Sequence, residues 1–264
     1  MPHAKRRLGQ HFLTDPRILA RIADALEAGP NDTVLEIGPG HGGLTGALVE
    51  KAGRVVAIEK DRGLVPSLKA RFPGVDVIEG DALDLDWHGL LPGPFLLAGN
   101  IPYNITSPLL DKALLPPLPR RIVFLVQKEV ADRVTARPGA SDYGALSVGL
   151  QSVARAERLF TVAAGAFQPR PKVDSAVLRL TPLAHPLVSD AERESFRAAV
   201  VGLFSYRRKQ LLRGVRELTG WEAALAGELL ERAAVSPTVR PEVLGPADFV
   251  QLHRALVDGG WRAR

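Results

Sequence analysis

The pentapeptide NIPYN, residues 100–104, lies just after an apolar run and carries groups that could act on a nucleobase. The Asn100 side-chain oxygen and the Ile101 carbonyl could accept the two N–H bonds of an exocyclic amine and so free its lone pair. Pro102 keeps the preceding residue extended and thereby directs that carbonyl. Tyr103 offers a ring for base stacking, worth about 1–3 kcal/mol. The residues therefore predict positioning and electrostatic support of a reaction at nitrogen; the simpler alternative is a strand-ending turn with a capping Asn.

A glycine loop follows an earlier predicted strand. Gly38, Gly40 and Gly43 have the spacing G-x-G-x-x-G, which lets a backbone pass close to a nucleotide before a helix begins. Glu59 lies 21 positions after Gly38, at the end of the next predicted strand, where a carboxylate can accept both hydroxyls of a ribose. These residues alone fit a nicotinamide oxidoreductase equally well, and the loop alone could be a tight turn without a ligand.

The next two strand ends separate these possibilities. Asp81, in the stretch Gly80-Asp81-Ala82, could accept a hydrogen bond from the amine of an adenine, and the Ala82 N–H could donate to the ring. Ligands of open α/β sheets bind at the carboxyl ends of the strands, so these groups would meet the NIPYN pentapeptide at one edge. An oxidoreductase would need an acid–base residue at the fourth strand end, and none is present there. The four strand ends carry the glycine loop, Glu59, Asp81 and NIPYN. The order and spacing of these four motifs are more specific than any one of them alone.

The chain alternates β-type and helical patterns. Near-continuous apolar runs predict strands over 33–37, 54–58, 75–78, 95–98 and 122–126. Helical patterns between them indicate a parallel sheet covered on both faces. Two later segments, 158–162 and 175–181, lack a helix between them and predict an antiparallel hairpin at one sheet edge. The pattern is then helical to about residue 258. We therefore expect an α/β domain over 1–182 and a small helical domain over 183–264.

Composition narrows the class of protein. The chain has 264 residues, no cysteine and a net charge of +5. The absence of cysteine excludes disulfides and Cys-ligated zinc and fits a reducing compartment, so we expect a cytoplasmic protein. No apolar stretch approaches the ~20 residues that span a bilayer, and no secretory signal is apparent. The basic balance suggests a polyanionic partner, with a merely solvated basic surface as the alternative.

Further motifs lie outside the strand ends. They are Lys5-Arg6-Arg7-Leu8-Gly9-Gln10-His11-Phe12-Leu13-Thr14-Asp15, Phe167-Gln168-Pro169-Arg170-Pro171-Lys172-Val173-Asp174-Ser175 and Arg207-Arg208-Lys209. Together with the glycine loop, Gly80-Asp81-Ala82 and NIPYN, they make nearly the whole chain similar to the ribosomal-RNA adenine N6,N6-dimethyltransferases, which use S-adenosyl-L-methionine. NIPY and F-x-P-x-P-K-V-D-S are specific in combination.

The resemblance implies a fold and a function. The fold would be a Rossmann-like class I methyltransferase sheet, mostly parallel with an antiparallel edge hairpin, followed by a small α-helical RNA-binding domain. The activity would be transfer of methyl groups from S-adenosyl-L-methionine to N6 of two adjacent adenosines in the 3′-terminal hairpin of small-subunit rRNA, with a role in small-subunit ribosome biogenesis. The alternatives are the large-subunit rRNA methyltransferases of the macrolide-resistance type and a non-catalytic ribosome-assembly factor.

The resemblance also extends the set of candidate site residues. The predicted catalytic residues are Asn100, Ile101, Pro102, Tyr103 and Phe167, the last of which would cover the face of the base opposite Tyr103. The predicted cofactor-binding residues are Gln10, His11, Leu13, Gly38, Gly40, Glu59, Asp81, Ala82 and Asn100. Methyl transfer from a sulfonium is an in-line displacement, so no metal is expected. Glu36 either helps to hold the methionine amine or is only structural.

Basic residues in two segments are candidates for contacts with RNA. The first segment contains Lys5, Arg6 and Arg7. The second contains Lys209, Arg213 and Arg216, whose spacing of four and three predicts one helix face opposite a buried face formed by Phe204, Leu211, Val215 and Leu218. The simpler alternative is a solvated helix surface. The expected partner is small-subunit rRNA within a pre-ribosomal small-subunit particle, bound by a monomer without a membrane.

Overall fold

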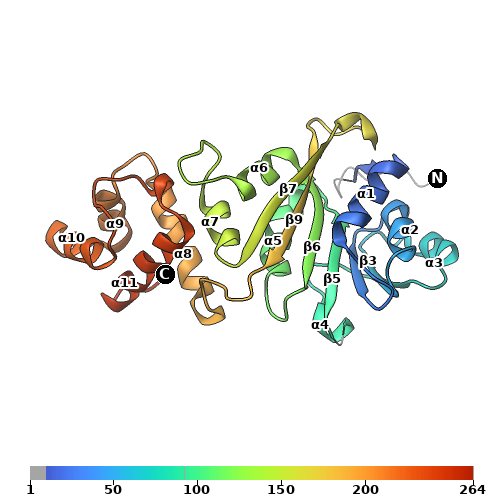
Figure 1. The fold of residues 1–264 in the computed structure, drawn as a ribbon, viewed down its shortest axis with the longest axis horizontal. Helices are drawn as coiled ribbons and strands as arrows, with labels where there is room; N and C mark the ends of the chain where they lie inside the picture. The colour runs from blue at the N-terminus through green and yellow to red at the C-terminus, as the bar shows by residue number, and fades with distance from the viewer. Residues whose placement is uncertain (1–9, 92, 264) are drawn as a thin grey trace. The chain divides into compact units, whose positions relative to one another are not determined.

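The structure is a computed structural model that describes residues 10–91 and 93–263 (Figure 1). The described residues form two units. The first runs to Ala131 and includes Ala156–Pro182; the second consists of Asp132–Arg155 and the chain from Leu183 onward. The division between the units after Pro182 falls at the domain boundary expected from the sequence. Residues Asp132–Arg155, which were expected in the first domain, pack with the second unit. The assignment of separate roles to two domains stays a prediction.

The first unit is built around a seven-stranded sheet with the order β4-β3-β2-β5-β6-β9-β7. The strands and helices up to β9 are β1 (Phe12–Leu13), α1 (Pro16–Leu26), β2 (Thr33–Ile37), α2 (Gly43–Val49), β3 (Arg54–Glu59), α3 (Val65–Arg71), β4 (Asp76–Glu79), α4 (Trp87–Leu90), β5 (Phe95–Asn100), α5 (Thr106–Ala113), β6 (Arg121–Gln127), α6 (Lys128–Thr135), α7 (Ala145–Gln151), β7 (Ala154–Val162), β8 (Phe167–Gln168) and β9 (Ser175–Pro182). Strands β2 to β6 pair in parallel, and β9 pairs antiparallel with β6. The predicted strands and the mostly parallel α/β sheet with an antiparallel edge are therefore confirmed.

Both faces of this sheet are covered. Val34 and Leu35 are neighbours in β2 and point to opposite faces, yet neither is exposed. The same holds for Leu96 and Leu97 in β5. Strands buried on both sides have no alternation of polar and apolar residues, which is why their continuous apolar runs could be recognised in the sequence.

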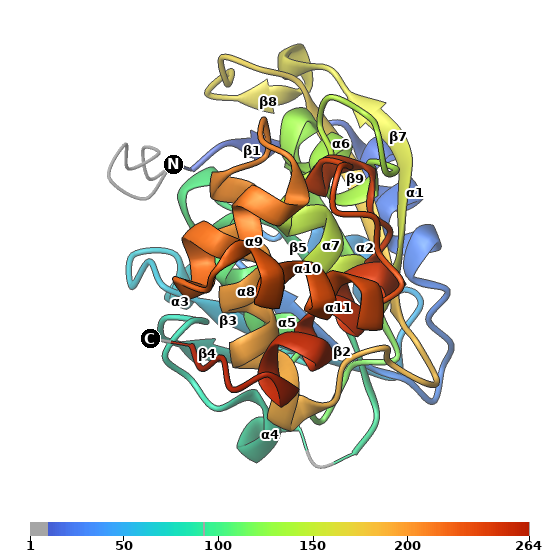
Figure 2. The same cartoon turned by 90° about the vertical axis from the view of Figure 1, so that its left-hand side faces the viewer.

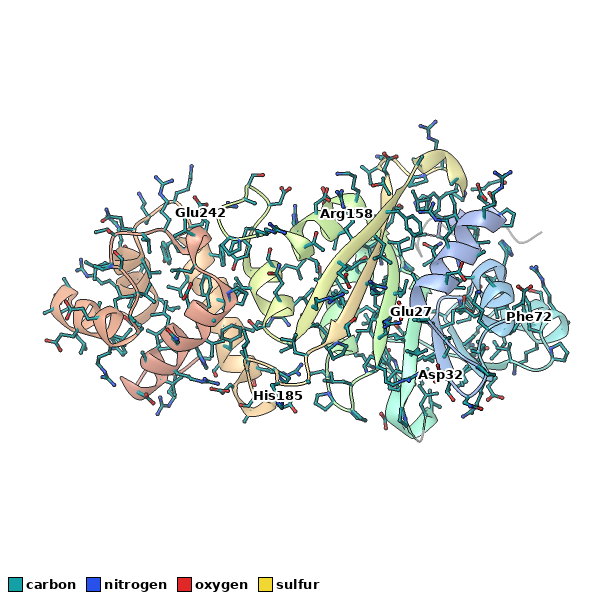
Figure 3. The ribbon with its side chains drawn as sticks, viewed as in Figure 1. Glu27, Asp32, Phe72, Arg158, His185 and Glu242 are labelled. Carbon is teal, nitrogen blue, oxygen red and sulfur yellow. The ribbon has the colours of Figure 1, made fainter. Side chains whose placement is uncertain are left out.

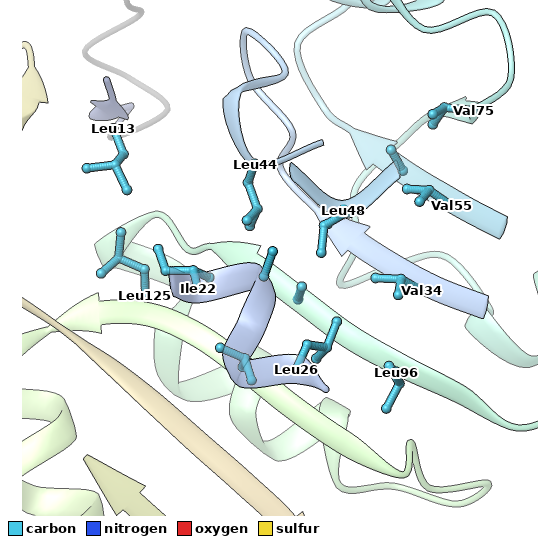
Figure 4. Packing of buried hydrophobic residues seen from close by; sticks show 14 of the residues in the cluster. Leu13, Ile22, Leu26, Val34, Leu44, Leu48, Val55, Val75, Leu96 and Leu125 are labelled. Atoms are coloured by element: carbon cyan, nitrogen blue, oxygen red, sulfur yellow. The ribbon is translucent and has the colours of Figure 1, made fainter. Parts of the chain in front are cut away.

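Helix α1 closes one face of the sheet. Its N-terminus is capped by Asp15, whose carboxylate accepts from the Arg17 N–H at 2.9 Å, and Pro16 begins the helix. Its buried residues Ile22 and Leu26 then pack with residues of α2 and the central strands (Figure 4). This packing places Phe12 and Leu13, just before α1, next to the glycine loop that precedes α2.

A second, two-stranded sheet was not expected from the sequence. Strand β1 pairs antiparallel with β8, with Phe12 opposite Gln168 and Leu13 opposite Phe167 (Figure 2). The Thr14 N–H extends the pairing by donating to the Ala166 carbonyl at 3.1 Å. Segments more than 150 residues apart in the chain are thereby held side by side.

The second unit is helical after Pro182, as expected. Its later helices are α8 (Arg193–Ser205), α9 (Leu211–Thr219), α10 (Ala223–Arg232) and α11 (Pro246–Asp258). Helices α8 and α10 each contact both α9 and α11 (Figure 2). Their apolar faces form one core. The turn between α8 and α9 corrects one expectation: Lys209 lies in this turn and shares no helix face with Arg213 and Arg216.

Partly exposed ion pairs occur in both units. Glu27, at the end of α1, contacts Arg121 of β6 and Arg179 of β9 at 2.7 and 3.1 Å (Figure 3). Glu242 contacts Arg207 in the second unit at 3.0 Å. Throughout residues 10–91 and 93–263, no helix combines the length and the apolar character that crossing a membrane requires.

Candidate active site

A pocket lies at the carboxyl ends of β2, β3, β4 and β5, and it brings together most of the predicted residues. Those that line it are Gln10, His11, Gly38, Gly40, Glu59, Asp81, Ala82, Asn100, Ile101, Pro102 and Tyr103. Strands β2 and β5 are neighbours, and the chain continues from β2 to β3 on one side and from β5 to β6 on the other. Such a switch point opens a crevice at the strand ends. The sheet order therefore explains why residues from four strands meet here.

The glycine loop bends sharply between β2 and α2. Gly38 and Gly40 have φ values of +69° and +60°, a conformation that side chains other than glycine rarely adopt. A Cβ at Gly40 would lie 2.8 Å from the Phe12 ring, so the N-terminal segment packs directly on the loop. Gly40 is therefore required both by its φ and by the Phe12 ring beside it.

Glu59 holds the same loop from the end of β3. Its two carboxylate oxygens accept the Gly40 N–H at 3.0 Å and the Asp61 N–H at 2.7 Å. Glu59 is buried, and burial raises the pKa of its carboxyl although these two backbone donors oppose the shift. A carboxylate has about four acceptor positions, which is more than the backbone N–H groups of Asp61, Gly40 and Lys60 occupy. The residue can thus fix the loop and still accept from a ligand hydroxyl in the pocket.

Asp81 follows β4 and is fixed by two partners. One carboxylate oxygen accepts the Leu83 N–H at 3.0 Å, and the other is paired with the Lys60 ammonium. Burial alone would raise the pKa of this carboxyl, but Lys60 and the Leu83 N–H outweigh it and lower the pKa. Asp81 is therefore an ionised acceptor. Lys60 was not predicted as part of the site.

Glu36 lies beneath the pocket, buried in β2 at 1% exposure. Its carboxyl accepts the Thr45 hydroxyl at 2.6 Å. Burial raises the pKa of Glu36 to about 8, against the effect of the Thr45 hydroxyl, and the nearby Glu59 carboxylate adds to the rise. Glu36 is thus a neutral acid at neutral pH, and the predicted contact with a ligand amine stays a prediction.

The Asn100 amide is oriented by the N-terminal segment. Its Nδ2 donates to the His11 carbonyl at 2.8 Å. A carbonyl can only accept, so the amide nitrogen must face His11 and the Oδ1 atom must face the other way. The backbone N–H of Ile101 donates to Leu125 in β6 at 3.0 Å, which anchors the same strand end. An acceptor oxygen is therefore preorganised in the pocket.

The Tyr103 ring is held at both ends. Its hydroxyl forms a hydrogen bond of 2.8 Å with the hydroxyl of Ser175, a fully buried residue at the start of β9. The His11 imidazole stacks on the ring with centroids 5.5 Å apart and 30° between the planes. His11 is fixed in turn by a hydrogen bond of 2.8 Å between Nδ1 and the Pro169 carbonyl. Neither Ser175 nor the imidazole was predicted to support the tyrosine.

Two predicted residues lie outside the pocket lining. Leu13 and Phe167 face each other across the β1–β8 pair and are 7% and 5% exposed. Both belong to the core formed with α1 and α2. The predicted contact of Phe167 with the second face of a base therefore stays a prediction.

Of the candidate RNA-binding residues, some are exposed on α9 and others lie outside the part of the chain that the structure describes. Arg213 and Arg216 are exposed on α9, and Arg213 forms an ion pair of 3.3 Å with Glu217. Leu211 and Val215 are buried on the other side of this helix, as expected. Lys5, Arg6 and Arg7 lie outside the described residues. The RNA-binding roles stay predictions.

Comparisons with known proteins agree on one family. The family model described as "Ribosomal RNA adenine dimethylase" matches residues 1–237. A ribosomal RNA small subunit methyltransferase A of Geobacter metallireducens is 41% identical over 96% of each chain, and one of Pseudomonas aeruginosa is 40% identical over 97% of this chain and 95% of its own. The sequence alone had indicated the same branch.

Solved structures support the same assignment. A dimethyladenosine transferase from Plasmodium falciparum superposes with a TM-score of 0.84 at 27% identity, covering 96% of this chain and 100% of its own. The 23S rRNA methyltransferase ErmE superposes with a TM-score of 0.73 at 30% identity, covering 93% and 99%. With the family model matched over most of the sequence and relatives of about 40% identity along its length, the chain belongs to the ribosomal RNA adenine dimethylase family.

Proposed function

We propose that this protein transfers methyl groups from S-adenosyl-L-methionine to adenosine N6 in small-subunit rRNA, giving N6,N6-dimethyladenosine. The observation that carries the proposal is the Asn100 amide. Its nitrogen donates to the His11 carbonyl at 2.8 Å, so its oxygen can accept from a ligand in the pocket that Tyr103 also lines. An adenine stacked on Tyr103 could donate its N6 hydrogen to that oxygen. The nitrogen lone pair would then be less delocalised into the ring.

The residues at the other strand ends fit an S-adenosyl cofactor. Glu59 would accept from the ribose hydroxyls, Asp81 from the adenine amine, and the loop at Gly38 leaves room for the methionine part. The acceptors are carboxylates and the loop has the positive φ values of a close backbone approach. When bound, such a cofactor supplies an electrophilic methyl group on sulfur. The protein contributes position, an acceptor for the amine and a stacking surface, and no group in NIPYN needs to take a proton in the transfer itself.

Two successive transfers are compatible with this arrangement. The unmodified amine has two N–H bonds, for which the Asn100 oxygen and the Ile101 carbonyl are the proposed acceptors. The monomethylated amine has one N–H bond left and can be held by one acceptor while the nitrogen is aligned again. The proposed targets are two adjacent adenosines in the 3′-terminal hairpin of small-subunit rRNA.

The relatives favour the small ribosomal subunit over the large one. Proteins named small subunit methyltransferase A are about 40% identical over 96–97% of this chain, while the 23S rRNA enzyme ErmE is 30% identical over 93%. The proposed partner is therefore the rRNA of a pre-ribosomal small-subunit particle, bound partly through Arg213 and Arg216. A role in the biogenesis of that subunit is proposed alongside the chemistry.

The test begins with cofactor binding. Calorimetry should detect tighter binding of S-adenosyl-L-methionine than of NAD. Both ligands carry an adenosine that would meet the same acceptors, so the difference in affinity reports how well the rest of each ligand fits the site. Small and large ribosomal subunits from a strain without these methyl groups are then incubated with enzyme and cofactor. Mass spectrometry should find N6,N6-dimethyladenosine only in the small-subunit rRNA. Methylation of large-subunit rRNA instead, or monomethyladenosine as the end product with excess enzyme, would refute the proposal.

A further inference from the structure

Lys112 is a partly buried lysine on α5 that bonds the loop carrying Asp81. Its ammonium group donates to the carbonyl of Leu83 at 2.6 Å and to the carbonyl of Leu85 at 2.7 Å. Both carbonyls belong to the loop between β4 and α4. Helix α5 starts three residues after Tyr103. The lysine therefore ties this loop to the helix that follows the NIPYN pentapeptide.

Leu83 connects Lys112 with Asp81. The Leu83 carbonyl accepts from Lys112, while its N–H donates to an Asp81 carboxylate oxygen at 3.0 Å. Both polar groups of this residue are thus fixed, and the orientation of the carboxylate depends on them. The Asp84 and Leu85 N–H groups also donate to the Asp81 carbonyl, each at 3.0 Å, which closes the loop on itself.

Trp87 completes the support of this loop. Its indole Nε1–H donates to the Ala82 carbonyl at 2.8 Å, and the Lys112 ammonium lies 5.1 Å from the centre of its ring. Burial lowers the pKa of Lys112, while Asp84, Asp86 and Asp81 act in the opposite direction. An ammonium group is costly to remove from water unless it is paired. The partners of the Lys112 ammonium are the carbonyls of Leu83 and Leu85 and the face of the Trp87 ring. All of them belong to the stretch between Leu83 and Trp87, so the ammonium is fully paired only when this stretch keeps its conformation.

We propose that Lys112 is a positioning residue that sets the preference of the cofactor site for adenine. By holding Leu83 it holds the Asp81 carboxylate and the Ala82 N–H in the arrangement that distinguishes an exocyclic amine from a carbonyl. Lys112 is not among the described residues that line the pocket, so it acts through the loop. The inference rests on the proposed function, because it requires the adenine of the cofactor to lie at Asp81.

The experiment compares two ligands that differ at this position. S-Adenosyl-L-homocysteine carries the amine, and S-inosyl-L-homocysteine carries a carbonyl in its place. Calorimetry measures both affinities for the wild type, Lys112→Met, Lys112→Arg and the control Lys69→Met, which removes an exposed lysine of α3. In Lys112→Met the affinity for the adenosyl ligand should fall about tenfold, the value of one charge-assisted hydrogen bond. The affinity for the inosyl ligand should change much less, so that the ratio of the two falls.

The controls separate positioning from general damage. Lys112→Arg can still donate to both carbonyls and should keep most of the wild-type ratio. Lys69→Met should keep all of it. If Lys112→Met does not fold, as judged by circular dichroism, Lys112→Gln replaces it, and an intermediate ratio is expected because the amide can serve one carbonyl.

Two results would overturn the inference. One is an unchanged ratio in a folded Lys112→Met or Lys112→Gln protein; the other is an equal loss of affinity for both ligands, which would make Lys112 a purely structural residue. A wild type that binds neither ligand would instead refute the proposed function, and the inference with it.

Discussion

Replacing Glu36 with Gln should make the protein more stable in mild alkali. The folded state raises the pKa of Glu36 from 4.5 to about 8, chiefly through burial, so folding favours the protonated acid. The stability linked to this proton is fully present below pH 4.5 and is lost as the pH rises to about 8. At about 1.36 kcal/mol for each pH unit, the loss in the free energy of unfolding is at most about 5 kcal/mol.

Glutamine mimics the protonated acid and has no charge to bury. It can still accept the hydrogen bond that Thr45 donates to Glu36 at 2.6 Å. The free energy of unfolding of the variant should therefore not fall between pH 4.5 and about 8 as that of the wild type does. Near pH 5 the two proteins should have similar stability. An exposed residue with the same substitution, Glu50→Gln, is the matched control and should follow the wild type at every pH.

Urea denaturation at intervals between pH 5 and pH 9, followed by circular dichroism, measures these differences. The free energy of unfolding of Glu36→Gln minus that of the wild type should grow as the pH rises and should level off above about pH 8. Curves for the two proteins that run parallel across this range would refute the reasoning, because they would mean that Glu36 is ionised in the folded protein throughout.

Three further predictions concern Asn100, the hydrogen bond between Tyr103 and Ser175, and the exposed arginines of α9. Asn100→Ala should lower the rate of methyl transfer by about 10²–10³-fold through loss of an oriented acceptor, with a much smaller effect on affinity for S-adenosyl-L-homocysteine in calorimetry. Tyr103→Phe and Ser175→Ala should have similar, mild effects on single-turnover transfer, since each removes the same hydrogen bond of 2.8 Å, and Tyr103→Ala should be far worse; a Tyr103→Phe enzyme as inactive as Tyr103→Ala would make the phenol a chemical participant. Replacing Arg213 and Arg216 with Glu should weaken binding to small ribosomal subunits and flatten its dependence on salt in filter-binding assays, without changing cofactor affinity.

The sheet and its ligand-binding edge could be predicted because they leave strong local patterns. Fully buried strands such as β5 and β6 are continuous apolar runs. Glu59 and Asn100 are the last residues of β3 and β5, and Asp81 follows the short strand β4 by two positions. Parallel strands bring those ends to one edge whatever the helices between them look like. For these residues the position in the sequence pattern determines the position in the fold, so the sequence was sufficient to predict that they meet in one site.

The supports of the site could not be predicted because they are contacts between distant segments. Strands β1 and β8 have two residues each, too few for any periodic pattern. The hydroxyl of Ser175 contacts Tyr103, which lies 72 positions earlier in the chain. The spacing of Lys209, Arg213 and Arg216 is that of a helix face, but α9 begins only at Leu211, after Lys209. Lys112 reads as an ordinary polar residue of α5. Only the folded chain shows which carbonyls it meets.

The glycine loop shows that a correct pattern can have more than one physical cause. At Gly38 the nearest atom to an added Cβ would be 3.8 Å away, so there the φ of +69° requires glycine. At the other two positions, side chains of the protein itself leave little room for a Cβ. A Cβ at Gly40 would lie 2.8 Å from the Phe12 ring, and a Cβ at Gly43 would lie 3.2 Å from Leu19. The spacing therefore reports the packing of the N-terminal segment on the loop as much as the approach of a nucleotide. This is why the loop alone fitted several ligands, and why the side chains that follow β4 and β5 had to decide between them.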